Sequence, residues 1–181
     1  MDSPVTPAPI LSASSDPSLD APWYALWVRS RTEKSVFDQL VRKDIEAFLP
    51  TVNRWSRWKD RKKLVAWPLF PSYCFARFDL RNTLAVRKCA GVVSVVSFEG
   101  TPAPIPAGQI SAIQTLVSSE LQYDPCPALH EGDMVEVVHG ALKGVTGRLI
   151  RKGPKTRLVL SITMINRAVS VAIDVADVRA Y

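Results

Sequence analysis

The sequence is poor in the residues that enzymes and metal sites use most. Its 181 residues include three cysteines and two histidines, and Cys74, Cys89 and Cys126 are widely spaced with no C-x-x-C pair. This spacing argues against a disulfide framework or a zinc site and favours a reducing cytoplasm. The phosphate-binding G-x-x-x-x-G-K-[ST] loop and the nucleophile motif G-x-S-x-G are also missing. We therefore expect a binding protein, with no catalytic residue, no metal and no cofactor.

Long apolar runs are missing as well. No stretch approaches the ~18 residues of a membrane-spanning helix, so no membrane association is expected. Residues 1–22 lack the basic start and apolar core of a secretory signal, and they hold three acidic residues, no basic residue and five prolines. Such a segment buries too little apolar surface to offset the entropy of ordering it. Residues 1–22 are therefore predicted to be a disordered tail.

Basic residues outnumber acidic residues in the rest of the chain. The net charge is +6, and an excess of basic residues in both 23–124 and 125–181 favours a polyanionic partner. The densest run, RWSRWKDRKK at 54–63, interleaves basic residues with two tryptophans. It suits phosphate neutralisation and base stacking, and it suits equally well a solvated hairpin tip. Its candidate nucleic-acid-binding residues are Arg54, Arg57, Lys59, Arg61, Lys62 and Lys63.

Hydrophobic periodicity predicts a mixed domain over residues 23–122. The order β-α-β-β-α-β-α favours an α+β fold in which helices cover an antiparallel four-stranded sheet. Strands are expected at 23–30, 47–55, 72–78 and 91–98, and helices at 33–45, 81–89 and 109–122. Thr32 is a candidate N-cap for the first helix, and Leu84 and Val86 are expected to be partly buried in the second. In the first strand, alternation puts Tyr24, Leu26 and Val28 on one face and Trp27 on the other.

The chain changes character after residue 122. Residues 123–129, YDPCPAL, contain two prolines and are predicted to be a linker. Residues 130–181 contain five short β-type segments with turn signals between them. A small barrel lets such strands protect their edges, so an all-β second domain is expected there.

Two sets of motifs resemble a known family. EGDMVEVVHGALKGVTGRLIRK, residues 131–152, resembles the KOW motif of small SH3-like barrels, with Gly147 at its signature glycine. Upstream, WYALWVRS, PLFPSYCFARF and CAGVVSVVSF resemble, in order, the N-terminal (NGN) domain of the NusG family. The resemblance covers about residues 23–181 and implies a monomeric, non-enzymatic bacterial transcription elongation factor. For Gly147, tight strand packing or free backbone geometry explains the need for glycine.

The resemblance implies that the first domain binds the clamp helices of the largest RNA polymerase subunit. The matching positions are Trp27, Tyr73 and Phe75, with Phe98 at the rim. Alternation places the first three on the less buried sheet face, where exposed aromatics can anchor an interface. The alternative is that all four rings are core, because helices can cover both faces of a sheet.

The resemblance also implies contacts with DNA. Arg29 and the pair Arg87 and Lys88 match positions that reach towards the non-template strand of the transcription bubble. The basic run at 54–63 matches a hairpin that lies near upstream DNA. Phosphate contacts position a protein on DNA and base contacts give sequence preference.

The second domain departs from the general family pattern in its partner loop. Relatives that contact a small-subunit ribosomal protein or the termination factor Rho carry an aromatic residue followed by glycine, whereas here Ile165 and Asn166 follow Met164 and precede Arg167. Binding of the ribosomal protein remains an alternative for this loop, whereas a contact with Rho is not expected. This favours a specialised, operon-directed antiterminator similar to RfaH and the polysaccharide-operon regulators. The alternatives are a general factor coupled to the ribosome or Rho, and a KOW-type ribosomal or RNA-binding protein using Lys143, Arg148, Arg151, Lys152, Lys155 and Arg157.

Overall fold

The computed structural model describes residues 21–57, 62–119, 121–127, 132–152 and 155–181. The predicted tail at 1–22 therefore lies almost wholly outside the described residues. The chain forms two compact units that divide after Pro104. The first is a mixed sheet-and-helix unit and the second contains an all-β sheet, so the predicted α+β architecture followed by a small all-β domain is confirmed. None of the helices in the described ranges is long and apolar enough to span a bilayer.

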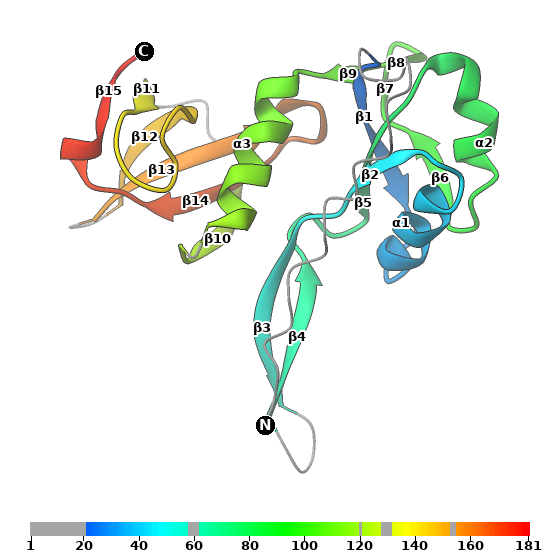
Figure 1. The fold of residues 1–181 in the computed structure, drawn as a ribbon, viewed down its shortest axis with the longest axis horizontal. Coiled ribbons are helices and arrows are strands. Elements are labelled where there is room, and N and C mark those ends of the chain that lie inside the picture. The colour runs from blue at the N-terminus through cyan, green and yellow to red at the C-terminus, as the bar shows by residue number, and fades with distance from the viewer. Residues whose placement is uncertain (1–20, 58–61, 120, 128–131, 153–154) are drawn as a thin grey trace. The chain divides into compact units, whose positions relative to one another are not determined.

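An antiparallel sheet forms the centre of the first unit (Figure 1). Its strands lie in the order β2-β5-β1-β6, and the short strand β9 at the end of the unit pairs with β1. These strands are β1 (Trp23–Val28), β2 (Glu46–Phe48), β5 (Tyr73–Arg77), β6 (Val92–Val95) and β9 (Pro104–Ile105). The helical segments are α1 (Glu33–Val41), the 3₁₀ turn η2 (Leu80–Asn82) and α2 (Thr83–Arg87).

One face of this sheet packs against both helices. Tyr24, Leu26 and Val28 of β1 lie in a single buried cluster with residues of the neighbouring strand and both helices, so the predicted alternation is confirmed. The other members include Cys74, Ala76, Phe78, Val36, Leu40 and Val86. Burial raises the pKa of the Cys74 thiol to about 12, which keeps this group protonated and unreactive at neutral pH.

Short antiparallel ribbons complete the first unit. β3 (Thr51–Arg57) pairs with β4 (Lys62–Pro68), and Figure 1 shows them extending from the sheet as a two-stranded ribbon. β7 (Ser97–Phe98) pairs with β8 (Thr101–Pro102). The sequence did not predict β4, because Pro68 and Pro71 argue against a strand; Pro68 is the last residue of β4, where a proline is tolerated. The predicted burial of Leu84 is wrong, since its side chain is 70% exposed on α2.

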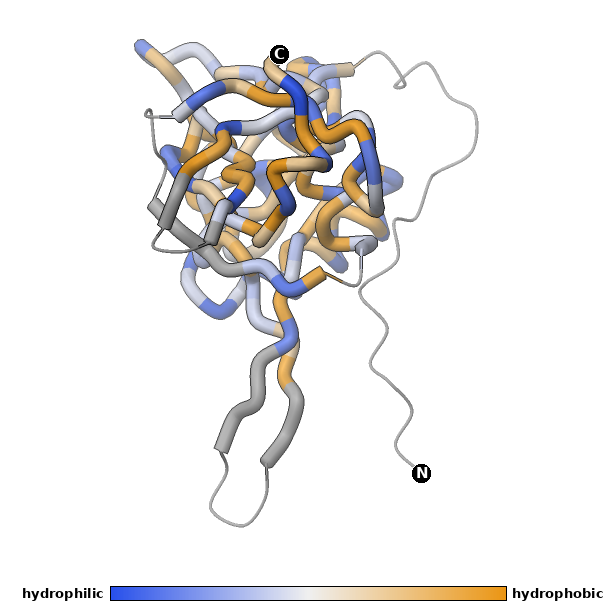
Figure 2. The backbone as a smooth tube through the Cα atoms, turned by 90° about the vertical axis from the view of Figure 1, so that its left-hand side faces the viewer, coloured by the Kyte–Doolittle hydropathy of each residue, from blue (hydrophilic) through white to orange (hydrophobic). Residues whose placement is uncertain are grey.

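The second unit combines one helix with a six-stranded antiparallel sheet in the order β10-β14-β13-β12-β11-β15. All five predicted strands are present, and Figure 2 shows hydrophobic and hydrophilic residues following one another in short stretches along the chain. The elements are α3 (Ala107–Ser118), β10 (Tyr123–Pro127), β11 (Asp133–Val137), β12 (Thr146–Lys152), β13 (Lys155–Ile162), η3 (Thr163–Ile165), β14 (Arg167–Ala172), η4 (Val175–Asp177) and β15 (Val178–Ala180). The buried centre includes Leu158, Leu160, Ile162 and Val169.

The segment predicted as a linker is mainly a strand. β10 pairs with β14 over its whole length, including Pro125 opposite Val169 and Pro127 opposite Arg167. A proline lacks the N–H that a central strand needs, but an edge strand tolerates it because one side of its backbone is unpaired. β10 lies at an end of the sheet order. Helix α3, which the sequence grouped with the first domain, contacts β13 within the second unit.

Gly147 lies in β12 close to the backbone of its antiparallel neighbour β13. A Cβ at this position would lie 2.7 Å from the carbonyl oxygen of Val159 and 2.9 Å from Leu160 Cδ2. We expect Gly147→Ala to lower the free energy of unfolding of this unit by about 1–3 kcal/mol, the usual cost of overpacking. Calorimetry of the full chain measures this. Gly108→Ala is the matched control, because a Cβ there meets nothing within 4 Å; equal effects of the two changes would contradict the close-packing explanation.

Candidate functional site

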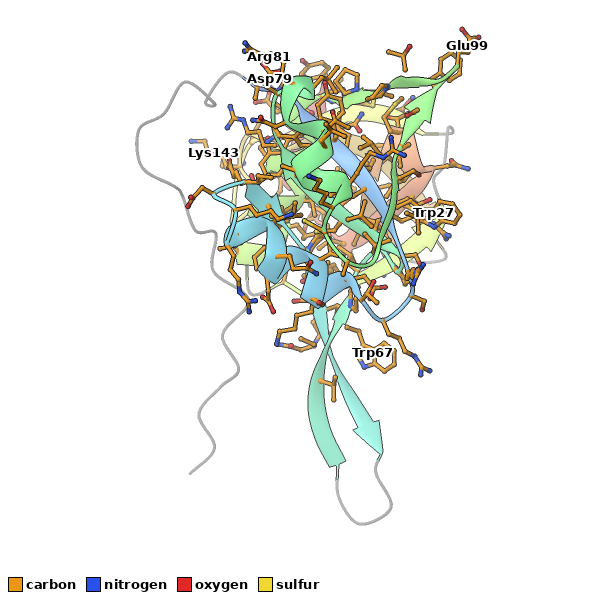
Figure 3. The ribbon with its side chains drawn as sticks, turned by 90° about the vertical axis from the view of Figure 1, so that its right-hand side faces the viewer. Trp27, Trp67, Asp79, Arg81, Glu99 and Lys143 are labelled. Carbon is orange, nitrogen blue, oxygen red and sulfur yellow. The ribbon has the colours of Figure 1, made fainter. Side chains whose placement is uncertain are left out.

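An aromatic pair lies on the sheet face opposite the helices. Trp27 of β1 pairs directly with Tyr73 of β5 on one side and with Ser94 of β6 on the other. Trp27 is 50% exposed and Tyr73 is half-buried. Figure 3 shows the Trp27 side chain projecting from the unit. We call Trp27 and Tyr73 the aromatic pair.

The backbone beside the aromatic pair is held by hydrogen bonds from buried groups. The backbone N–H of Val28 donates to the carbonyl of Ser72 (2.9 Å), and the N–H of Ser72 donates to the carboxylate of Glu33 (2.9 Å). Glu33 is buried, and Ser72 has a left-handed φ of 67°. A buried acceptor thus fixes the turn that enters β5, one residue before Tyr73.

The predicted exposure of Phe75 is wrong. Its side chain is fully buried, and its ring centroid lies 5.9 Å from that of Phe70 and 6.2 Å from that of Phe48. Strand alternation correctly placed Phe75 on the face opposite the helices, but it did not show that flanking segments cover that face. Phe75 therefore supports the sheet beneath the aromatic pair and offers no surface of its own.

Two further exposed aromatics lie in the ribbons. Phe98 is 70% exposed, as predicted for a rim residue, and it precedes the turn of Glu99 and Gly100, where both residues have positive φ. Figure 3 shows Glu99 well separated from Trp27 in the view. Trp67 of β4 is 52% exposed and was missed from the sequence. Its neighbours Ala66 and Pro68 are exposed and half-buried, so no alternation of buried and exposed residues marks Trp67 in the sequence.

The structure brings the segments of the three predicted DNA-binding cations close together. The N–H of Arg29 donates to the carbonyl of Gly91 (2.8 Å), three residues after Lys88. The side chain of Gln39 bonds both the carbonyl and the N–H of Ala90 (3.0 and 2.8 Å). Arg29, Arg87 and Lys88 are all exposed, and within the described ranges none has an ion pair. We call Arg29, Arg87 and Lys88 the basic cluster.

A close approach between Gly91 and Thr32 fixes the loop beside the basic cluster. Gly91 has a φ of +104°, and a Cβ there would lie 2.7 Å from Thr32 Oγ1. Helix α1 begins directly after Thr32, as predicted, but the Thr32 hydroxyl donates to the carbonyl of Arg29 (2.6 Å) and does not cap the helix. Arg31, which the sequence analysis missed, is exposed with a φ of 68°.

Two other cations of the first unit form ion pairs within it. Arg81 forms a two-pronged ion pair with Asp79, and these hydrogen bonds lower the pKa of Asp79 to about 2. Arg77 pairs with Glu46 at 3.4 Å. The tip of the basic run, residues 58–61, and the side chains of the remaining residues in 54–64 lie outside the described residues. Only the ribbon backbone of Arg54, Arg57, Lys62 and Lys63 is described.

The predicted partner loop of the second unit, residues 164–167, directly follows Thr163, which a glutamine of α3 holds. We call residues 163–167 the 163–167 loop. Gln109 Nε2 donates to Thr163 Oγ1 (2.5 Å), and the N–H of Thr163 donates to Gln109 Oε1 (3.0 Å). Met164 is 38% exposed and Arg167 is exposed, but Ile165 is buried. Asn166 has a left-handed φ of 49° and φ/ψ values of the αL region. Ile165 is thus not presented to a partner in this conformation.

No group of three or more His, Cys, Asp or Glu side chains that could hold a metal ion occurs in the described part of the chain. The recognisable features are therefore surfaces: the aromatic pair, the basic cluster and the 163–167 loop. These arrangements suit binding of a protein and of a polyanion.

Comparison with protein-family models identifies the family. A family sequence model described as "NusG: Transcription termination factor nusG" matches residues 21–114. A search of curated proteins finds no match. The solved structure "Domain interaction in Thermotoga maritima NusG" is similar with a TM-score of 0.53 and 22% identity, covering 90% of this chain and 98% of that one. Conformation A of the MjSpt4:Spt5 complex matches with a TM-score of 0.27 and 16% identity, over 88% of this chain and 97% of that one.

At these identities the structural likeness concerns the fold alone. The family sequence model, however, covers more than half of the chain, from the start of β1 into α3. The protein therefore belongs to the NusG family of non-enzymatic transcription factors.

Proposed function

We propose that the protein is a transcription elongation and antitermination factor that binds the clamp helices of the largest RNA polymerase subunit. The observation that carries the proposal is the half-exposed ring of Trp27 next to Tyr73 on an otherwise covered sheet face. Tryptophan and tyrosine dominate binding energy at protein interfaces. A water-exposed indole held on a rigid strand needs little ordering to bind.

The basic cluster would contact the non-template DNA strand. Arg29, Arg87 and Lys88 are exposed without an ion pair among the described residues, so their charge is available for phosphates. The basic run at 54–63 holds six cations in the sequence, four of which belong to β3 and β4, and it would face upstream DNA. Both contacts are electrostatic and therefore depend on salt.

Binding across the polymerase cleft would suppress pausing by a shift of population. A factor changes an equilibrium only by its difference in affinity for the two states. Stronger contacts with the closed, elongating state would disfavour the paused state. A coupling of about 1–3 kcal/mol would change pause occupancy roughly 5–150-fold.

Removing the basic cluster should weaken DNA binding. We expect a triple variant with Arg29→Gln, Arg87→Gln and Lys88→Gln to depend less on salt when it binds single-stranded DNA. The negative slope of log affinity against log salt should become shallower by about 2, since each phosphate contact contributes about 0.7 to its magnitude. Titration of a labelled oligonucleotide at several salt concentrations measures the slope. Arg81→Gln is the control, because Arg81 is already paired with Asp79. A triple variant whose slope equals that of wild type would contradict the assignment.

We further propose a specialised, operon-directed role, with the 163–167 loop taking a small-subunit ribosomal protein and not Rho. The loop carries Ile165 and Asn166 in place of the aromatic–glycine pair of general relatives. The test is transcription of a template with a Rho-dependent terminator. We expect this protein to raise readthrough, whereas a rise in termination at that site would favour the general, Rho-assisting role.

The alternative of an RNA-binding barrel has less support. Arg148 donates to the carbonyl of Gly132, and Arg157 donates to both the hydroxyl and the carbonyl of Ser170. These two arginines are occupied within the unit. Of the six cations that suggested this role, Lys143 is exposed, and the side chains of Arg151, Lys152 and Lys155 lie outside the described residues.

A further inference from the structure

We propose that Trp67 is a stacking platform for an unpaired DNA base, in line with the cations of the β3–β4 ribbon. The inference rests on the proposed function, in which this ribbon faces upstream DNA. It adds that the ribbon binds single-stranded DNA through a base as well as through phosphates, and it names the side chain that holds the base.

The first support is the exposed indole of Trp67. The residue is 52% exposed, and Figure 3 shows its side chain projecting outwards where the ribbon begins. Within the described ranges, this indole takes part in no ring contact. Its cross-strand partner Val52 is itself only half-buried. About half of the indole surface is therefore open to a ligand.

The second support is that the ribbon is fixed to the sheet close to Trp67. The N–H of Leu69 donates to the carbonyl of Pro50 (2.8 Å), which joins the two chain segments two residues after Trp67. Leu69 and Phe70 are almost completely buried, and the Phe70 ring packs edge-on against that of Phe75. An aromatic ring on a rigid support needs little ordering when it binds a ligand.

The third support is the charge of the ribbon. β3 and β4 together contain four basic residues and no acidic residue. In their register, Arg54 is opposite Val65 and Lys63 is opposite Ser56. Because opposite residues share a face and successive residues alternate, Arg54 and Lys63 lie on the same face of the ribbon as Trp67. Proteins that bind single strands combine aromatic rings for the bases with cations for the phosphates.

Stacking distinguishes this ligand from duplex DNA. In a duplex each base is covered by its neighbours, so an indole reaches a base face only where the base is out of the stack. Phosphate contacts alone require cations and gain nothing from an exposed tryptophan. The combination of ring and cations therefore favours unpaired bases, such as those that a transcription bubble exposes.

Replacements that differ only in the ring test the platform. We expect Trp67→Ala to weaken binding of the full chain to a labelled oligothymidylate at least about 5-fold, the lower limit for losing one stacked base. Trp67→Phe should keep most of the affinity. Trp67→Leu is apolar but has no aromatic face, so it should bind as weakly as Trp67→Ala. Wild-type affinity in either the alanine or the leucine variant would overturn the inference.

Tyr181→Ala is the matched control for loss of an exposed ring. Tyr181 is 79% exposed and lies at the end of the second unit, outside the ribbon. We expect this variant to bind the oligothymidylate as wild type does. A loss equal to that of Trp67→Ala would show a general effect of aromatic surface and would contradict a platform at Trp67.

Salt and strandedness separate stacking from other contacts. Stacking involves no charge, so Trp67→Ala should lower the affinity equally at every salt concentration and keep the wild-type slope. Annealing the oligothymidylate to oligoadenylate should abolish the difference between Trp67→Ala and wild type. A changed slope, an equal loss with the duplex, or a loss seen only with single-stranded RNA or only with nucleic-acid-free polymerase would overturn the inference.

The platform and the proposed function fail in different experiments. If Trp67→Ala loses affinity for the oligothymidylate while wild type does not bind polymerase, the proposed function is wrong and the platform stands. If wild type binds polymerase and Trp67→Ala binds the oligothymidylate as wild type does, the platform is wrong and the proposed function stands.

Discussion

Trp27→Ala should abolish co-purification of the protein with RNA polymerase while leaving its fold intact. The indole is half exposed, so truncation removes the proposed interface anchor and creates no cavity. Loss of a central aromatic at an interface costs about 2 kcal/mol or more, which is roughly a 30-fold loss of affinity. Affinity is measured with purified polymerase, and circular dichroism checks the fold.

Trp67→Ala provides a matched control for this experiment. Trp67 is 52% exposed, almost the same as Trp27, but it lies on the β3–β4 ribbon and not on the sheet. The change removes the same side chain from a similarly exposed position. We expect near wild-type binding. If both variants bind polymerase as wild type does, the aromatic pair is not the anchor; if both lose binding equally, the interface extends onto the ribbon.

Phe75→Ala should destabilise the first unit by about 3–5 kcal/mol, because it removes a fully buried ring and leaves a cavity between Phe48 and Phe70. All five tryptophans lie between residues 23 and 67. Tryptophan fluorescence during urea unfolding of the full chain therefore reports the first unit alone.

Comparison with Tyr73→Phe separates residues that stabilise the sheet from residues that contact the polymerase. Tyr73 is half-buried and pairs with Trp27, and the Tyr73→Phe variant keeps its ring while removing its hydroxyl. We expect it to be nearly as stable as wild type. Phe75→Leu, a smaller truncation, should lose stability and yet bind polymerase under conditions where it is folded. A stable, folded Phe75→Leu that fails to bind would return Phe75 to the interface.

Much of the first unit was predictable from residues that lie near one another in sequence. Alternation in β1 and β5 assigned their faces correctly, because successive strand residues point to opposite sides. The spacing of Val36 and Leu40 located α1, because residues four apart lie on one face of a helix. Both residues are buried in the cluster that the sheet and helices form. Position within a strand or helix is a local property that the sequence carries.

The candidate site was only partly predictable. Trp27 and Phe98 are exposed as expected, whereas Phe75 is covered and Trp67 is exposed without having been predicted. The segments that carry the basic cluster meet because the backbone N–H of Arg29, the residue after β1, donates to the carbonyl of Gly91, in the segment after α2. The sequence offers the cations, but their proximity depends on this long-range pairing.

The sequence by itself determined the family and most of the main helices and strands, apart from β4 and β10. These follow from local periodicity and from motifs. The tertiary structure decided which segments cover the sheet beside Tyr73, that Pro125 and Pro127 lie in an edge strand, and that α3 packs on the second unit. The physical reason is that the burial of a residue depends on which distant segments pack against its face. The residues next to it in sequence do not indicate which segments these are.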